Sequence, residues 1–218
     1  MPPPLKSTNT SAIAWSVLPL LALAGATDTL MILHSKELLA VYMTGNSTKL
    51  GGFVVQGDWT MAGEIISVIG IFVLATTFAA WIGDRAGRTR SGVLLLFVGL
   101  LLAIAAPLAA QSAQKYSLAT VMVIAAAMGI LNQVRADEPG VTFVTGSLVK
   151  LGRCLATGKF GAAADAFSRW LCLLIGALLG AWLDDYLGAA TLWLLAALAA
   201  AGALTAWLLQ PHGRPQAT

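Results

Sequence analysis

The sequence predicts an all-α, polytopic membrane protein of six transmembrane helices, arranged as a 3+3 inverted-topology repeat with two broken re-entrant helices. Three observations indicate this fold class. Only 11% of the residues are charged and 58% are hydrophobic, whereas soluble domains carry about 25% charged residues. The hydrophobic residues form runs of about 20, long enough to cross a hydrocarbon core of about 30 Å. A short polar motif, TGN at 44–46, also returns as TGS at 145–147.

The composition leaves no room for a soluble domain, since the mean hydropathy is +0.80. Nucleic-acid binding is not expected, because the net charge of +3 comes from scattered basic residues. Cys154 and Cys172 lie in or beside apolar segments without metal-ligand spacing, so no metal or other cofactor is expected. The N-terminal apolar run continues to Leu33, past the ALAGA stretch where a signal peptide would be cleaved. An uncleaved first span is therefore predicted.

Six apolar segments have the length and composition of transmembrane helices. They are residues 12–33, 60–81, 91–111, 117–134, 161–183 and 189–209, and residues 1–11 and 210–218 form tails. Two less apolar stretches, 37–56 and 138–157, either dip into the membrane and return or cross it fully. Cytoplasmic loops carry the excess of Lys and Arg. Returning stretches with a cytoplasmic N-terminus leave nine basic residues inside and three outside, whereas full crossing places the basic loop at 84–90 outside. We therefore predict returning stretches and cytoplasmic N and C termini.

The two halves of the chain repeat at a fixed shift of 101 residues. The shift carries Thr44 to Thr145, Gly45 to Gly146, Lys49 to Lys150, Gly57 to Gly158 and Trp81 to Trp182. Repeat 1 covers residues 12–111 with a broken helix at 37–56, and repeat 2 covers 117–209 with a broken helix at 138–157. Because each repeat holds an odd number of spans, the second is inverted, and transporters often bind their solute at interrupted helices of such repeats. A duplicated scaffold without a pathway is the alternative.

The two motifs predict how each broken helix is built. Gly45 supplies a break after a short helix, and Asn46 is a strong N-cap for a new half-helix. Gly146 and Ser147 do the same in repeat 2, so two half-helix N-termini, each attractive to anions, would oppose each other near mid-membrane. Lys49 and Lys150, at the third position of each half-helix, would raise the positive potential. They either contact a bound anion or extend along the membrane to an interface.

Ionisable and polar residues inside spans add further candidates. Asp28 and its counterpart Asn132 either couple transport to a proton or cation through Asp28, or form structural hydrogen bonds. Arg169, four residues after Asp165, either contacts an anion or is neutralised within that pair. The predicted solute-binding set is Thr44, Gly45, Asn46, Lys49, Thr145, Gly146, Ser147, Lys150, Asp28, Asn132 and Arg169. A GxxxG step, 176–180, predicts close helix packing within the bundle or across a homodimer.

Four motifs resemble one family. They are GATD at 25–28, MTGN at 43–46, MGILNQ at 128–133 and VTG at 144–146. On these motifs, from about Ala22 to Leu209, the chain resembles the YoaK-like six-span membrane proteins of bacteria, a family of unknown function. It departs from the family pattern at 131–133, where LNQ replaces an expected Gln-Asn, and at Ser147 after the second Thr-Gly. The resemblance implies the fold rather than an activity.

The function class that these features favour is an inner-membrane transporter or channel. Its solute would be small and anionic or strongly polar, bound at the midplane between the two half-helix N-termini. A non-transporting accessory or assembly subunit of a larger membrane complex is the alternative. No nucleophile-base pair, metal motif or phosphate loop occurs in the sequence, so the protein is not expected to be an enzyme. The expected location is the bacterial inner membrane, in contact with the lipid bilayer.

Overall fold

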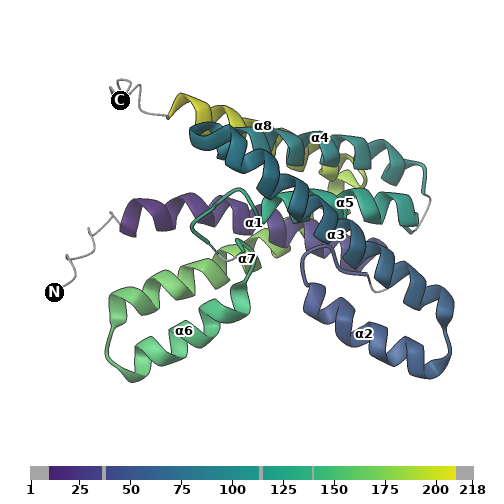
Figure 1. The fold of residues 1–218 in the computed structure, drawn as a ribbon, viewed down its shortest axis with the longest axis horizontal. Coiled ribbons are helices and arrows are strands. Elements are labelled where there is room, and N and C mark those ends of the chain that lie inside the picture. The colour runs from purple at the N-terminus through teal and green to yellow at the C-terminus, as the bar shows by residue number, and fades with distance from the viewer. Residues whose placement is uncertain (1–9, 36–37, 113–114, 139, 210–218) are drawn as a thin grey trace.

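The computed structural model describes residues 10–35, 38–112, 115–138 and 140–209 of the chain. Helices are the regular secondary structure of these residues, with no strand among them (Figure 1). The elements are α1 (Thr10–His34), α2 (Met43–Gln56), α3 (Trp59–Ala86), a 3-10 turn η1 (Gly87–Thr89), α4 (Arg90–Ala110), α5 (Leu118–Leu131), α6 (Val144–Ala156), α7 (Phe160–Leu187) and α8 (Ala190–Leu208). The predicted tails lie almost wholly outside the described residues.

The described residues contain four segments that are long and apolar enough to cross a membrane. They are Val17–His34, Trp59–Ala110, Phe160–Leu187 and Ala190–Leu208. The second is 52 residues long and contains α3, η1 and α4. The helix α5 has 14 residues, which is about 21 Å at 1.5 Å per residue and short of the hydrocarbon thickness. The count of six spans is therefore not confirmed.

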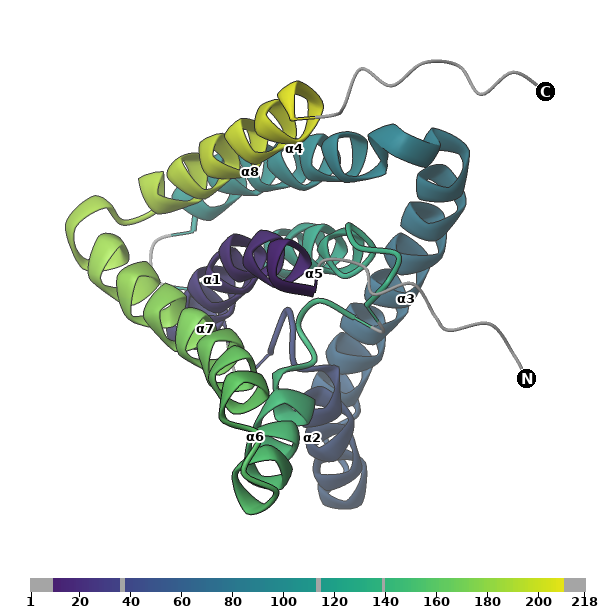
Figure 2. The ribbon, with the colours of Figure 1, turned by 90° about the vertical axis from the view of Figure 1, so that its left-hand side faces the viewer.

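Helices from distant parts of the chain pack against one another in pairs. α1 lies along α7, α3 along α5 and α4 along α8, while α2 and α6 fold back against α3 and α7 (Figures 1 and 2). Glycines permit this approach: a Cβ at Gly25 would overlap the carbonyl oxygen of Leu173, and one at Gly176 would overlap that of Ala22. The GxxxG step at 176–180 is therefore used inside the chain, where α7 meets α1.

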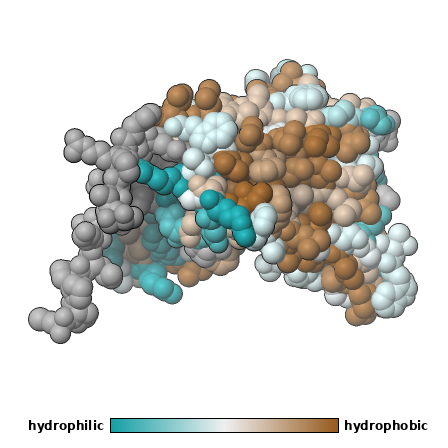
Figure 3. All heavy atoms as spheres, turned by 45° about the horizontal axis from the view of Figure 1, so that its top comes forward, coloured by the Kyte–Doolittle hydropathy of each residue, from teal (hydrophilic) through white to brown (hydrophobic). Residues whose placement is uncertain are grey.

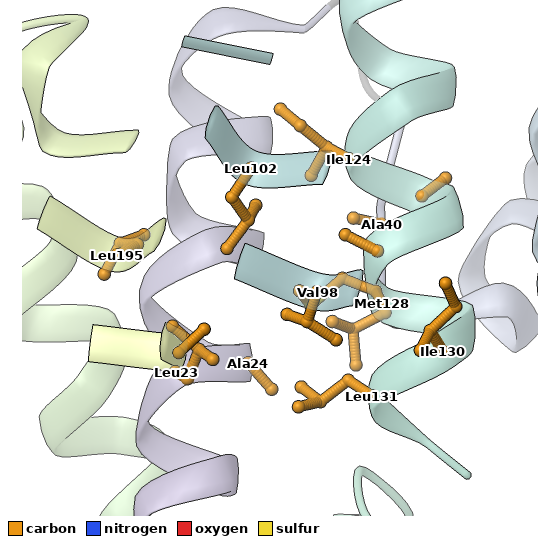
Figure 4. Close-up of a cluster of buried hydrophobic side chains, with 14 of the residues drawn as sticks. Leu23, Ala24, Ala40, Val98, Leu102, Ile124, Met128, Ile130, Leu131 and Leu195 are labelled. Atoms are coloured by element: carbon orange, nitrogen blue, oxygen red, sulfur yellow. The ribbon is translucent and has the colours of Figure 1, made fainter. Parts of the chain in front are cut away.

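A buried apolar cluster fills the centre, where α1, α4, α5 and α8 meet (Figure 4). Leu102, Ile124, Met128 and Leu131 have no exposed surface. Large apolar side chains also cover the outside, as expected where lipid is the solvent (Figure 3). In that solvent helices associate through close packing and interhelical hydrogen bonds rather than through the hydrophobic effect.

Polar contacts define the two ends of the bundle. At one end, His34 Nε2 lies 2.7 Å from Asp184 Oδ2, and the Tyr116 N–H donates to the His34 carbonyl over 2.7 Å. At the other end, Arg90 Nε donates to the Gln133 carbonyl over 2.8 Å. The C-terminal ends of α1 and α7 therefore meet the start of α5, and the start of α4 meets the end of α5. α1, α4 and α7 run one way and α5 runs the other.

The helices α2 and α6 begin earlier than predicted. We expected a break at each Thr-Gly pair and new half-helices from Asn46 and Ser147. Both helices instead begin three residues before those positions and continue unbroken through Gly45 and Gly146. The described non-helical connections, residues 38–42 and 140–143, lie before the motifs. The position predicted for the break was wrong.

Asn46 and Ser147 are consequently not N-caps, and Lys49 and Lys150 are not in the first turn. Each lysine is the seventh residue of its helix, where the free N–H groups of the helix start are out of reach. The physical reason lies in tertiary contacts: a neighbouring buried carboxylate, Asp28, already accepts from the backbone just before α2.

Candidate functional site

A polar pocket of about 340 Å³ lies at the start of α6. Its lining comes from the connection before α6, from the first two turns of α6 and from the facing side of α7. The lining residues are Glu138, Gly140, Val141, Phe143, Gly146, Ser147, Lys150 and Arg169. We call it the α6 pocket. It brings together four of the predicted solute-binding residues, Gly146, Ser147, Lys150 and Arg169.

Arg169 is fixed in this pocket by an ion pair with Glu138. Its Nη1 and Nη2 donate to the two carboxylate oxygens over 3.0 and 2.7 Å, and both side chains are only 17% exposed. Fork-to-fork pairs of this kind are short, strong and directional. The guanidinium Nε is buried without a hydrogen bond in the described part of the chain, although Asp165 Oδ2 lies 4.0 Å away. Arg169 therefore has one buried donor not used by Glu138.

Lys150 is the second cation of the pocket. Its Nζ lies 3.2 Å from Asp165 Oδ2, and its side chain is 52% exposed. An ion pair as exposed as this contributes little free energy where water reaches it. Both cations thus have carboxylate partners, so the pocket presents donors and acceptors together rather than a bare positive charge.

Five of the eight lining residues of the α6 pocket differ from the residues 101 positions earlier, and three of these differences change size or charge most. Gly140 and Ser147 replace the larger Leu39 and Asn46, and Arg169 replaces Val68. In the first half, Asn46 is fully buried and bonds both the N–H and the carbonyl of Leu39 over 3.1 and 2.8 Å. The shorter Ser147 leaves the equivalent space open. The two motifs are alike in letters but differ in what they enclose.

Asp28 and Asn132 hold the connections before α2 and α6. Asp28 is 3% exposed, and its Oδ1 accepts from the N–H groups of Ala40 and Val41 over 2.9 and 3.0 Å. Asn132 Oδ1 accepts from the N–H and the hydroxyl of Thr142 over 3.1 and 2.9 Å. The structural hydrogen bonds that were one alternative for this pair are therefore present. The other oxygen of Asp28 is buried without a partner among the described residues.

The remaining predicted residues lie outside the pocket. Thr44 and Thr145 are exposed on α2 and α6. A Cβ at Gly45 would lie 3.0 Å from the Leu39 side chain, so Gly45 approaches its own connection rather than an opposing helix. Lys49 is partly buried on α2. Among the described residues, the α6 pocket is therefore lined by the second motif and not by the first.

Glu138 was missed by the sequence analysis. It stands in a short acidic stretch, ADEPG at 136–140, which reads as a solvated connection between helices. The one feature of the sequence that could have pointed to Glu138 as a site residue is its position a few residues before the second motif. Its neighbour Asp137 does behave as a surface residue: hydrogen bonds from Arg135, over 3.0 and 2.8 Å, hold the pKa of Asp137 below its usual range.

Comparison with known proteins identifies the family. Residues 17–205 match the family described as "Protein of unknown function (DUF1275)". The chain belongs to the DUF1275 family. It is also 30% identical over 182 residues to the UPF0700 transmembrane protein RA0705 of Rhizobium meliloti (strain 1021), covering 81% of this chain and 79% of the relative. No solved structure matches the chain.

These relatives and the apolar helices show that this DUF1275 protein is embedded in a membrane. The narrower YoaK-like assignment is not confirmed by the family match. The inner membrane and the direction of the termini remain predictions.

Proposed function

We propose that this DUF1275 protein is an inner-membrane transporter or channel for a small anionic or strongly polar solute, which binds in the α6 pocket. The observation that carries the proposal is the cluster of three charged side chains, Glu138, Lys150 and Arg169, around one pocket of about 340 Å³. Charged groups within membrane helices are expensive and usually serve substrate or ion pathways. No enzymatic step is part of the proposal.

The proposed topology is six spans in a 3+3 inverted repeat, with α2 and α6 as re-entrant half-helices and both termini cytoplasmic. Geometry that recurs 101 residues apart supports it. Gly57 and Gly158 both have positive φ, 75° and 67°, as do Gly87 and Gly188, 52° and 54°. In Figure 1 the hairpins α2–α3 and α6–α7 spread to opposite ends, and the first residues of α2 and α6 point toward the middle.

In the α6 pocket, each residue has a proposed role. Arg169 contacts the anionic or most electron-rich part of the solute, because its buried Nε donates no hydrogen bond within the described part of the chain. Glu138 holds the guanidinium in place through two hydrogen bonds. Ser147 supplies a hydroxyl, and Lys150, which is half exposed, meets the solute at the entrance. A solute with acceptors and a donor would suit this mixed lining better than a simple halide.

Asp28 is proposed as the coupling group for a proton or cation. Its carboxylate has one oxygen held by the backbone of Ala40 and Val41, and its other oxygen is buried with no hydrogen-bond partner among the residues that the structure describes. Binding of a proton or cation at that second oxygen would neutralise the carboxylate, while the first oxygen could still accept from the backbone before α2. Since Asn132 cannot titrate, only the first half would respond. Asp28→Asn should then reduce the pH dependence of uptake while leaving solute affinity nearly unchanged.

The decisive test replaces Ser147 by asparagine, the residue found at the equivalent position 46 of the first half. Ser147→Asn should fill the α6 pocket, as Asn46 does in the first half, without removing a charge. Purified protein is screened for a rise in melting temperature with small anions and neutral polar solutes, and any hit is followed as uptake into proteoliposomes. Ser147→Asn should abolish both responses. Ser47→Asn, on the exposed face of α2, is the matched control and should behave like the wild type.

Charge variants extend the test. Glu138→Gln with Arg169→Gln removes the buried pair as a unit, which avoids leaving one buried charge unpaired. Loss of a hydrogen bond to a charged group is worth about 1.5–3 kcal/mol, so affinity should fall roughly tenfold or more. Arg153→Gln, exposed on α6, is the control. Full binding and uptake in Ser147→Asn would contradict the site. No solute response at all, together with stoichiometric co-purification of one membrane protein, would favour the accessory-subunit alternative.

A further inference from the structure

A second hollow lies away from the α6 pocket, between the helix pair α1/α7 and the helix pair α4/α8. Its apolar part has a volume of about 290 Å³, and every lining residue is hydrophobic, glycine or proline. It continues into a hollow of about 380 Å³. Pro19, Leu20, Leu95 and Gly202 line both parts. We call the continuous space the α1–α8 groove.

The groove arises because one helix pair packs less closely than the equivalent pair in the other half. α5 packs closely along α4, whereas its counterpart α1 touches α8 only slightly (Figure 2). Ala199 and Gly202 of α8 present little or no side chain to the groove, beside Leu195 and Leu198 of the same helix. A Cβ added at Gly202 would meet only Leu95 Cδ1, at 3.4 Å, an ordinary contact distance. The space can therefore accept added atoms without moving the backbone.

The second part of the groove is polar and positively charged at its mouth. Arg88, Ser91 and Arg135 line it. This is the end of the bundle where Arg90 meets Gln133. Arg135 shares its guanidinium with Asp137 over 3.0 and 2.8 Å, but a guanidinium carries five N–H donors and can hold a phosphate beside a carboxylate. Arg88 is exposed.

An apolar channel that ends in two arginines matches the shape of a phospholipid. Within a bilayer the apolar part is surrounded by acyl chains, so one of these rather than water occupies it. The charge at the mouth selects an anionic headgroup, because basic pockets between membrane helices on the cytoplasmic side bind such headgroups. We infer that the α1–α8 groove binds an anionic phospholipid, with one acyl chain between α1 and α8 and the phosphate at Arg88 and Arg135.

The experiment uses the full chain in detergent and three probes. Dioleoyl phosphatidylglycerol should raise the melting temperature at lower concentration than dioleoyl phosphatidylcholine, and sn-glycerol 3-phosphate should have no effect. Native mass spectrometry should show one retained phosphatidylglycerol. Arg88→Gln with Arg135→Gln should raise the half-saturating phosphatidylglycerol concentration about fivefold per arginine, at about 1 kcal/mol for each basic side chain near an anionic surface. Arg153→Gln is the charge control.

A groove-filling variant tests the acyl chain separately. Gly202→Leu should abolish retention of the lipid, whereas Gly70→Leu, which adds the same side chain on α3 where nothing lies within 4 Å, should not. Equal stabilisation by phosphatidylglycerol and phosphatidylcholine would overturn the inference, as would stabilisation by sn-glycerol 3-phosphate alone. A change of oligomeric state in Gly202→Leu with lipid retention intact would instead make the groove an interface between copies. Ser147→Asn should leave lipid retention unchanged, so failure of the solute proposal does not decide this one.

Discussion

Single buried polar side chains fasten the two non-helical connections of this protein. Asp28 and Asn132 each present one oxygen to backbone N–H groups ahead of α2 and α6. Inside a membrane protein no water is available to hydrogen-bond with such N–H groups. Non-helical backbone is therefore tolerated only where other groups of the protein accept its hydrogen bonds. The amide at Asn132 shows that a negative charge is not needed for this task.

This comparison predicts the outcome of two substitutions at one position. Asp28→Asn should keep the fold, because an amide oxygen can still accept from Ala40 and Val41. Asp28→Leu leaves two buried N–H groups without an acceptor, at about 1–3 kcal/mol each. Unfolding of the two variants and the wild type by heat or denaturant, in a mild detergent, measures the difference in their stability. Equal stability of Asp28→Leu and wild type would show that the connection is held by other contacts.

At the same scale, the sequence identified Asp28, Asn132 and Arg169 as residues needing an explanation, because polar groups in apolar runs are visible by contrast. Apart from Asp165, four residues before Arg169 and 4.0 Å from its Nε, their partners could not be predicted from the sequence. The backbone groups of 40–41 and the carboxylate of Glu138 come close only after folding, and an acidic residue beside a Pro-Gly pair is ordinary in a surface connection.

Whole helices approach one another through glycine, and this separates the glycines into two kinds. An added methyl at Gly176 would overlap the backbone of Ala22, which cannot move aside, whereas at Gly45 it meets the end of the flexible Leu39 side chain at 3.0 Å. Gly176→Ala should therefore destabilise by about 1–3 kcal/mol, as overpacking does. Gly45→Ala should be neutral or gain up to about 1 kcal/mol of helix propensity.

Gly70→Ala is the control for that pair, since open space surrounds the position. Thermal unfolding of the three variants orders them, and a Gly45→Ala variant less stable than Gly176→Ala would reverse the assignment. The sequence analysis ended the two polar stretches at 56 and 157, and α2 and α6 end at Gln56 and Ala156. It misplaced the starts of both helices, because the residue types of the motifs indicate N-caps at Asn46 and Ser147. In the structure, the side chains of Asp28 and Asn132, distant in sequence, bind the backbone just before each helix.

Over the whole molecule, four close pairings cross between the halves: α1 with α7, α3 with α5, α4 with α8, and α4 with α5. The first helix of each half packs against helices of the other half, so the described residues form one packed unit. The sequence indicated the repetition through a constant shift. It did not indicate how differently Asn46 and Ser147 are used, since one is fully buried against Leu39 and the other lines the α6 pocket.

The topology prediction follows from the ends of the bundle. If α3 and α4 each cross once and α2 returns, a cysteine at Gln56 and one at Ser112 lie on the outer side, and one at Thr89 lies in the cytoplasm. The cysteines are introduced singly in a Cys154→Ala, Cys172→Ala background and treated in intact cells with a membrane-impermeant maleimide. Gln56→Cys and Ser112→Cys should be labelled, and Thr89→Cys only after the cells are opened. If α2 crossed the membrane fully, Thr89→Cys would be labelled from outside and the other two from inside. That pattern would reject the inverted repeat together with its re-entrant half-helices.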